Sequence, residues 1–145
     1  MIYDKTSPQF AHFDEISPEL LFKGLPTPCY VIDADILEKN AKILKGVADR
    51  TGARILLAQK AFSNFALYPI LSRYLDGSEA SGLFEARLGY EEMPGKEVHV
   101  FSAAYRGDQF DELLKYADHI VFNSPGQLAK FGPAAKAAGK SVGLR

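Results

Sequence analysis

Short apolar runs recur at a regular interval from residue 55 onward, and each run ends at a polar or turn residue. These closing residues follow one another every 21 or 22 positions and are Lys60, Ser81, Ser102, Asn123 and Arg145. Helix-sized segments lie between the runs, at 84–92, 109–116 and 126–138. A strand followed by a helical crossover at a fixed interval is typical of a repeated βα unit, because parallel strands need such crossovers.

The runs themselves are the predicted strands, at 55–57, 79–80, 98–101, 120–122 and 142–144. The first lies in the stretch 53–62, whose continuous apolar positions predict a strand buried on both faces. Repeated right-handed βα units form either a doubly wound sheet or a closed barrel. The doubly wound alternative loses support because no glycine-rich nucleotide-binding motif follows any predicted strand. Since a barrel has eight units, the chain is expected to form about five units of one.

The first third of the chain carries other signals. Ser17 before Pro18 predicts one or two capped helical turns, and the apolar run Cys29–Asp33 predicts a strand. Asp33 or Asp35 is expected to cap a helix that keeps a helical apolar period until Gly52, a favourable residue for ending it. A further helix is predicted at 65–75.

Composition narrows the class of protein. The 145 residues are 47% hydrophobic and 24% charged, as in a soluble globular domain, and the net charge of −1 favours neither nucleic acid nor an acidic membrane as partner. No apolar run approaches the roughly 18 residues that a membrane helix needs, and no secretory signal is visible. The single cysteine, Cys29, excludes an internal disulfide, suits the cytoplasm and is expected to be a small buried side chain.

The strand ends are where the chemistry is expected, because open α/β sheets and barrels place their sites at the carboxyl ends of the strands. Lys60 is the strongest candidate, since burial favours the neutral amine that forms a Schiff base. A surface lysine that marks the end of burial is the alternative. Ser81 and Gly82 either present backbone N–H groups to an anion or form an ordinary turn.

Other chemistry has less support. Glu85 and Arg87 lie in the first turns of a predicted helix, where a solvated pair is the simpler interpretation. The histidines lack Cys, His or carboxylate neighbours at ligand spacing, so no metal site is expected; they are His12, His99 and His119. No Gly-x-Ser-x-Gly elbow is present, so serine hydrolase chemistry is unsupported.

Four stretches, at 27–33, 56–62, 80–89 and 118–124, resemble the carboxynorspermidine (carboxyspermidine) decarboxylase family. That family belongs to the fold-type III, alanine-racemase-like pyridoxal-phosphate enzymes. The resemblance runs from about Thr27 to Arg145. The stretches at 27–31 and around Lys60 are shared across the superfamily, whereas 80–89 and 119–124 are specific to the narrower family.

The resemblance implies that Lys60 carries pyridoxal 5'-phosphate. It also implies that Ser81 and Glu85 lie near the cofactor and that Arg145 lines the same pocket. Residues 34–145 would be part of the pyridoxal-phosphate-binding (β/α)8 barrel. Residues 1–33 would be an N-terminal segment with a strand of a second, β domain.

The whole protein would accordingly decarboxylate a polyamine precursor as a cytoplasmic homodimer, and the 145 residues alone would be inactive. Two alternatives remain open. One is another fold-type III enzyme, such as a diaminopimelate decarboxylase or an amino-acid racemase. The other is a non-catalytic regulatory relative.

Overall fold

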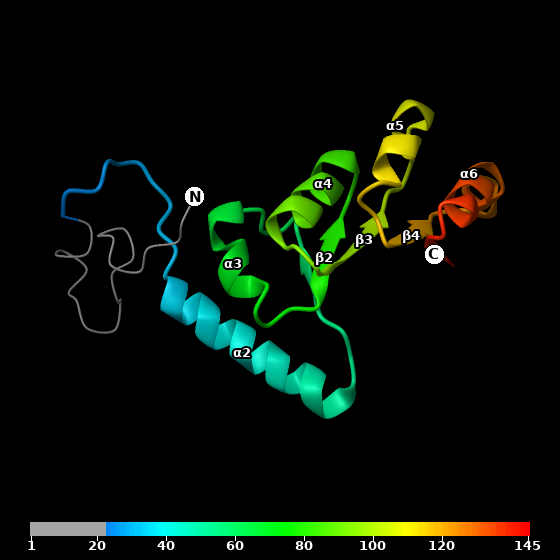
Figure 1. The fold of residues 1–145 in the computed structure, drawn as a ribbon. Coiled ribbons are helices and arrows are strands. Elements are labelled where there is room, and N and C mark those ends of the chain that lie inside the picture. The colour runs from blue at the N-terminus through cyan, green and yellow to red at the C-terminus, as the bar shows by residue number, and fades with distance from the viewer. Residues whose placement is uncertain (1–22) are drawn as a thin grey trace.

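The computed structural model describes residues 23–145, so the turns predicted around Ser17 lie outside the described residues. Five parallel strands form one sheet in the order of the sequence: β1 (Leu56–Ala58), β2 (Gly77–Ala80), β3 (Glu97–Phe101), β4 (His119–Phe122) and β5 (Ser141–Leu144). The crossovers contain η1 (Phe65–Leu67), α3 (Tyr68–Leu71), α4 (Leu83–Glu92), α5 (Gly107–Leu113) and α6 (Pro125–Ala137). A longer helix, α2 (Ala34–Thr51), precedes β1 (Figure 1). The predicted 21-residue βα repeat is confirmed.

Two aspartates fix the starts of neighbouring strands in the same way. The Asp76 Oδ2 atom accepts a hydrogen bond from the Ile55 N–H at 2.8 Å, and Asp118 Oδ2 accepts one from the Val98 N–H at 2.9 Å. The backbone carbonyl of each aspartate accepts from the strand on its other side, at Glu97 and Ser141. Each aspartate therefore joins two strands at their amino ends and helps to set the register of the sheet.

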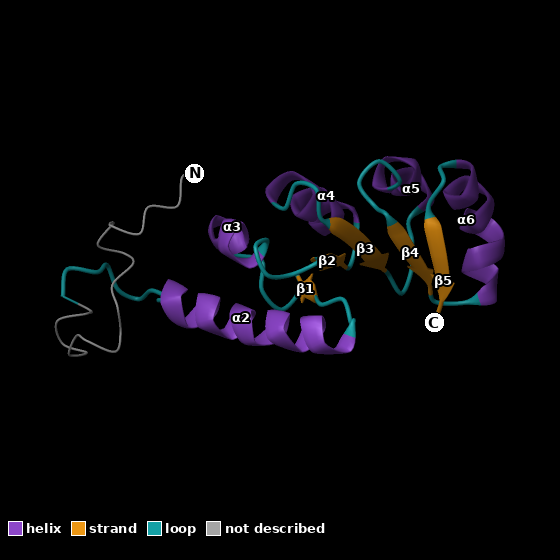
Figure 2. Ribbon diagram, turned by 60° about the horizontal axis from the view of Figure 1, so that its bottom comes forward, coloured by secondary structure: helices purple, strands orange, loops and turns teal. Residues whose placement is uncertain are grey.

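The main core lies between the sheet and its helices. Val98, Val100, Ile120 and Phe122 are almost fully buried on this side. They pack with aromatic rings of the crossover helices, including Phe110 and Phe131, whose ring centroids are 4.5 Å apart. Figure 2 shows α4, α5 and α6 together on one side of β3, β4 and β5. The alternate strand residues, such as Glu97, His99 and Phe101, are half-buried on what we call the inner face of the sheet.

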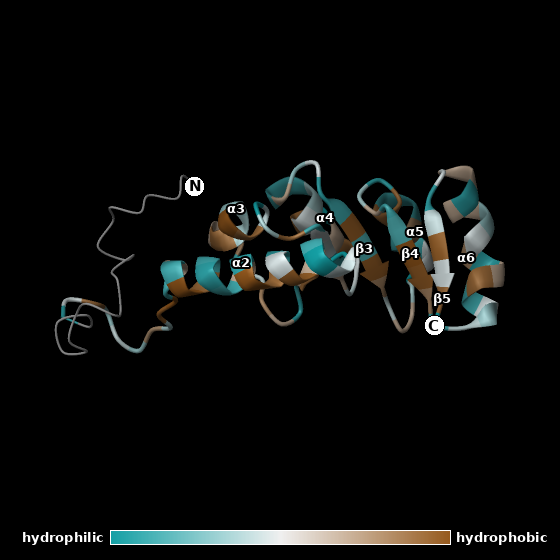
Figure 3. Cartoon of the chain, turned by 90° about the horizontal axis from the view of Figure 1, so that it is seen from below, coloured by the Kyte–Doolittle hydropathy of each residue, from teal (hydrophilic) through white to brown (hydrophobic). Residues whose placement is uncertain are grey.

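Helix α2 begins and ends where the sequence predicted. Asp33 caps it, because Asp33 Oδ1 accepts from the N–H groups of Asp35 and Ile36 at 2.8 and 2.9 Å. Gly52 ends it in the left-handed conformation, with φ at 72°. The helix contributes Ala41 to the core around Leu57. Figure 3 shows apolar positions along the length of α2. Four apolar residues of this helix are exposed: Ile36, Ile43, Leu44 and Val47.

Three local expectations are wrong. Residues 29–33 form no strand, and Cys29 is exposed, because no described segment pairs with this run and a lone strand leaves its backbone groups without partners. The helix expected at 65–75 is shorter: the 3₁₀ turn η1 and the single α-helical turn α3 replace it. Strand β1 is not buried on both faces, since only Leu57 is buried and its neighbours on the strand are half-buried. None of the described helices is long and apolar enough to cross a membrane.

Residues 1–145 produced alone are expected to self-associate. Within the described residues, β1 and β5 each pair with one strand only, and Val142 and Leu144 of β5 are 45% and 54% exposed. An apolar groove of about 350 Å³ also lies between α2 and β1. Unprotected edges and apolar patches of this kind promote association. Sedimentation velocity should show oligomers that grow with concentration, whereas a monomer with one cooperative melt would contradict this expectation.

Candidate functional site

The strand ends predicted to carry the site lie at one edge of the sheet, because all five strands are parallel. Ladder hydrogen bonds continue beyond the strands on both sides: the Gln59 N–H donates to Glu79 O at 3.1 Å and the Arg145 N–H to Phe122 O at 2.9 Å. The alternation of side chains then assigns Arg145 to the inner face, whereas Lys60 lies in the turn that follows β1. The Arg145 guanidinium lies 4.5 Å from the centre of the Phe101 ring, which is on the inner face, so the contact agrees with this placement of Arg145. We call this edge the carboxyl edge.

Lys60 follows β1 in a turn and is exposed, so the burial on which its sequence-based interpretation partly rested is not found. Among the described residues, no carboxylate forms an ion pair with its amine. An amine that is exposed and not engaged by a carboxylate is accessible to a carbonyl compound that enters at the carboxyl edge.

The neighbour of Lys60 is the buried residue that sequence reasoning did not single out. Gln59 is only 1% exposed. Its Nε2 atom donates to the Glu85 carbonyl at 2.8 Å, and its Oε1 atom accepts from the Tyr68 hydroxyl at 3.1 Å. Burial raises the pKa of Tyr68 to about 12, so the hydroxyl keeps its proton for this bond. Gln59 thus ties the lysine-bearing turn to α3 and to the first turn of α4.

Gln59→Ala is expected to lower the free energy of unfolding by about 2–4 kcal/mol, because it opens a cavity and removes a partner from the buried Tyr68 hydroxyl and from the part-buried Glu85 carbonyl. Tyr68→Phe is the matched control, since it removes only one of the two bonds and should cost about 1 kcal/mol. Urea denaturation followed by circular dichroism measures both. Equal effects of the two substitutions would show that the bond to Glu85 contributes nothing.

The Glu85 side chain accepts a hydrogen bond from the backbone just before its own helix. Its Oε2 atom accepts from the Ser81 N–H at 2.6 Å. Two units later, Gln127 Oε1 accepts from the Asn123 N–H at 2.9 Å in the same i, i+4 arrangement. The repeated bond satisfies a backbone donor just before each helix, so it fixes the conformation of the loops at the carboxyl edge.

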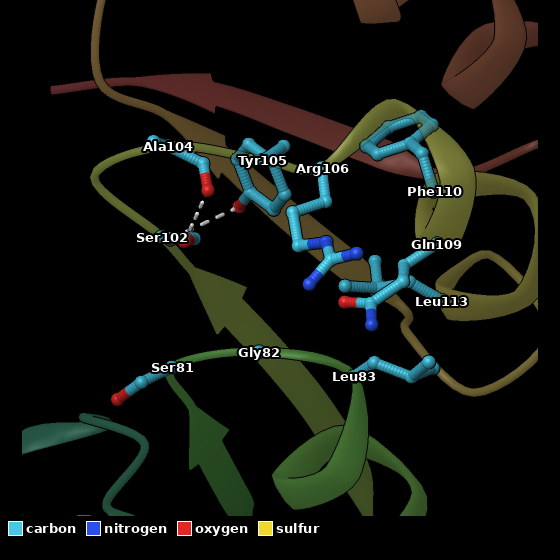
Figure 4. A pocket seen from close by; sticks show the side chains of 10 residues that line it. All are labelled: Ser81, Gly82, Leu83, Ser102, Ala104, Tyr105, Arg106, Gln109, Phe110 and Leu113. Atoms are coloured by element: carbon cyan, nitrogen blue, oxygen red, sulfur yellow. Dashed lines mark hydrogen bonds between the residues drawn. The ribbon is translucent and has the colours of Figure 1, made fainter.

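A cavity of about 180 Å³ opens beside Ser81, between the ends of β2 and β3 and helix α5 (Figure 4). The Tyr105 hydroxyl is 3.0 Å from Val100 O and 2.9 Å from Val121 O, and burial raises its pKa to about 12. Ser102 lines the cavity, with its Oγ atom donating to Ala104 O at 3.1 Å. Arg106 lies at the same cavity and pairs with Asp108 at 2.6 Å. An anion at this cavity would compete with Asp108 for the Arg106 guanidinium and with Ala104 O for the Ser102 hydroxyl.

The structure also assembles a cluster that spacing along the chain did not suggest. Glu97 and His99 lie two residues apart on β3, and the register places His119 of β4 beside His99. Hydrogen bonds from Arg54 and from His99 lower the pKa of Glu97 to about 2, so its carboxylate is ionised. The sequence signal was the spacing Glu97-x-His99 at the start of the predicted strand 98–101, so the expectation that His99 has no carboxylate at ligand spacing is wrong. The second histidine needed the register of the sheet.

No family model matches the chain. Among curated proteins, a carboxynorspermidine/carboxyspermidine decarboxylase of Herminiimonas arsenicoxydans is 36% identical over 121 residues, covering 83% of this chain and 32% of that protein. The decarboxylase of the same name from Campylobacter jejuni is 38% identical over 126 residues, covering 87% and 32%. The chain is homologous to about a third of these decarboxylases. A carboxyaminopropylagmatine decarboxylase of Synechocystis is also similar, at 39% identity over 122 residues, covering 84% of the chain and 31% of that protein.

Two solved structures are also similar to this chain. The Campylobacter jejuni carboxynorspermidine decarboxylase, crystallised with norspermidine, has a TM-score of 0.77 at 37% identity, covering 81% of this chain and 31% of that one. The D-threonine aldolase of Filomicrobium marinum has a TM-score of 0.67 at 17% identity, covering 82% and 33%, and this likeness shows the fold alone. The predicted α/β fold class, five βα units of a barrel, is confirmed, and so is the family resemblance. The chain spans about a third of the length of the relatives that it matches.

Proposed function

We propose that this chain is part of a pyridoxal-phosphate-dependent decarboxylase that removes the carboxylate of carboxynorspermidine or carboxyspermidine. The observation that carries the proposal is the 38% identity to a decarboxylase with these substrates in its name, over a segment that includes the lysine at the carboxyl edge. By the same resemblance, we infer a cytoplasmic homodimer that takes a small polyamine substrate and neither nucleic acid nor a membrane.

The residues of the carboxyl edge fit the cofactor in their chemistry. Lys60 offers an exposed amine for covalent attachment. Ser81 and Arg145, both exposed at the same edge, offer a hydroxyl and a permanent positive charge to a phosphorylated ligand or a carboxylate. Glu85 would act through Ser81, because its carboxylate already accepts the Ser81 N–H. We therefore assign Glu85 as a residue that positions Ser81 and not as one that contacts the cofactor.

Pyridoxal phosphate, when bound, supplies the conjugated ring that accepts the electron pair left behind as carbon dioxide departs. The chain supplies binding and orientation. The Lys60 amine would hold the cofactor covalently. Gln59 keeps the Lys60 turn at a fixed position relative to α4, through its bond to the Glu85 carbonyl. Arg145, over the Phe101 ring, places a positive charge on the inner face where an anionic group would need one.

A second candidate substrate has a specific observation in its favour. The Synechocystis relative is as similar as the other two, and its name specifies carboxyaminopropylagmatine. An enzyme of that kind would keep the lysine and the decarboxylation chemistry, and would differ in how it recognises the far end of the substrate.

Carbon dioxide release by the full-length protein distinguishes these possibilities. With pyridoxal phosphate added, kcat/KM for carboxynorspermidine or carboxyspermidine should exceed that for ornithine, lysine or diaminopimelate by at least about a hundredfold, as expected when a site's buried polar groups match one substrate. Carboxyaminopropylagmatine as the best substrate would favour the second candidate. A preference for one of the three amino acids would overturn both.

A further inference from the structure

Glu97, His99 and His119 bring three potential metal ligands together on the inner face of the sheet. All three side chains are half-buried, with exposed fractions of 30%, 26% and 33%. One ligand atom from each lies within 4.8 Å of the other two. Glu97 and His119 are the first residues of β3 and β4, and His99 is in the middle of β3. The cluster therefore lies away from the carboxyl edge and is separate from the site proposed around Lys60.

The distances approach those of a tetrahedral site. His99 Nε2 is 3.1 Å from Glu97 Oε2, and His119 Nε2 is 3.7 Å from the same oxygen. Ligand atoms that each lie about 2.0–2.1 Å from a tetrahedral zinc ion are about 3.3–3.4 Å apart. The two imidazole rings stack with centroids 4.1 Å apart and planes 25° apart. In the metal-bound form His99 would carry its proton on Nδ1 in place of the Nε2–H···Oε2 bond, and a rotation of the rings would direct both Nε2 lone pairs toward the space beside Glu97 Oε2.

The second oxygen of the carboxylate already has a partner. Arg54 Nη1 contacts Glu97 Oε1, so this ion pair orients the carboxylate and leaves Oε2 between the two histidines. A fixed partner on the non-ligating atom is a common feature of metal sites, where it holds the ligand in position. Two imidazoles and one carboxylate are also the donor set that zinc accepts when one coordination position stays open to water.

We propose that Glu97, His99 and His119 form a Zn²⁺ site, with Glu97 Oε2 and the two Nε2 atoms as ligands and water in the fourth position. The site would join β3 to β4 through their side chains, on the face opposite the main core. Zinc bound there would stabilise the pairing of the two strands, because a ligand that binds only the folded state shifts the folding equilibrium toward it.

The test uses full-length protein without a histidine tag, stripped by a chelator and titrated with Zn²⁺ against a chromophoric competitor. Glu97→Gln and His119→Ala should each raise the Kd for one equivalent of Zn²⁺ by at least about a hundredfold. This is more than the loss of an outer-shell partner usually changes metal affinity. Arg54→Gln changes only the residue that contacts the non-ligating oxygen of Glu97, so it should raise the Kd for Zn²⁺ by about tenfold. Glu79→Gln is the matched control, since it removes a carboxylate paired in register with His99 but outside the cluster, and should leave the affinity unchanged.

Co²⁺ provides a second measurement that does not depend on the variants folding. The unmodified protein should show the strong visible absorption of tetrahedral Co²⁺, and excess Zn²⁺ should abolish it. The melting temperature should also rise with added Zn²⁺, less so in Glu97→Gln than in Glu79→Gln. Absence of a stoichiometric zinc site, or a site that survives Glu97→Gln and His119→Ala unchanged, would overturn the proposal and leave the cluster as a polar contact between strands.

Discussion

Replacing Lys60 by alanine is expected to reduce kcat/KM for carbon dioxide release by at least about a thousandfold, the scale on which the loss of a covalent catalytic group acts. The same change should remove the visible absorbance band of the bound cofactor. The physical reason is that the Lys60 amine is the group at the carboxyl edge that can bind a carbonyl covalently, and alanine retains no nucleophile there. Steady-state kinetics and absorbance spectra of the full-length protein measure both effects.

Two control variants distinguish the loss of the nucleophilic amine of Lys60 from the loss of its positive charge and from a loss of folding. Lys60→Arg retains the positive charge without a nucleophilic amine, so it should lose activity as Lys60→Ala does. Lys115→Ala removes an exposed lysine after helix α5, between α5 and β4, and should leave activity and absorbance unchanged. Because Lys60 is exposed, all three variants should melt within a few degrees of the unmodified protein. Activity above about a tenth of the original in Lys60→Ala would be incompatible with the assigned role.

Gly77→Ala is expected to cause the largest loss of stability among single changes in the sheet. A Cβ atom at residue 77 would lie 2.1 Å from the carbonyl oxygen of Glu97 and 2.9 Å from its carbonyl carbon. Gly77 is paired with Glu97 across β2 and β3, so backbone atoms rather than a flexible side chain would have to move. The unfolding free energy should fall by at least about 3 kcal/mol, the upper end for overpacking.

The matched control is Gly107→Ala, at the first residue of α5. An added Cβ there meets no atom within 4 Å, and the residue does not need a positive φ. Alanine at a helix position is otherwise favourable, so this substitution should be neutral or stabilising by up to about 1 kcal/mol. Urea denaturation of the two variants should therefore differ strongly. If Gly77→Ala unfolds at the same urea concentration as Gly107→Ala, the close approach of β2 to β3 is not as tight as the structure has it.

Local signals in the sequence predicted much of the fold. The 21-residue interval identified five strands whose bounds lie within two residues of those found, because each strand end is a change from apolar to polar positions. Asp33 and Gly52 located both ends of α2, since capping depends on neighbouring residues only. The run Cys29–Asp33 failed because a strand depends on a partner, which the pattern of one segment cannot supply.

The site was predictable to the extent that it depends on strand ends. Lys60 and Arg145 were expected at one edge because the carboxyl ends of parallel strands meet there, and both follow their strands at that edge. Gln59 was missed because its partners, Tyr68 and Glu85, come from two other helices. The cluster of Glu97, His99 and His119 was missed for a similar reason: His99 and His119 are adjacent only through the register of β3 and β4. Spacing along the chain therefore does not predict contacts between residues of different strands and helices.

The attachment of pyridoxal phosphate to Lys60 is tested by peptide mapping of the reduced cofactor adduct. Full-length protein incubated with pyridoxal phosphate, reduced with borohydride and digested should yield one major labelled peptide, with the pyridoxyl group on Lys60. Fragmentation spectra assign the modified residue without reference to activity or to any variant. We expect the label on Lys60; label on a different lysine, or no stoichiometric label, would show that Lys60 does not hold the cofactor.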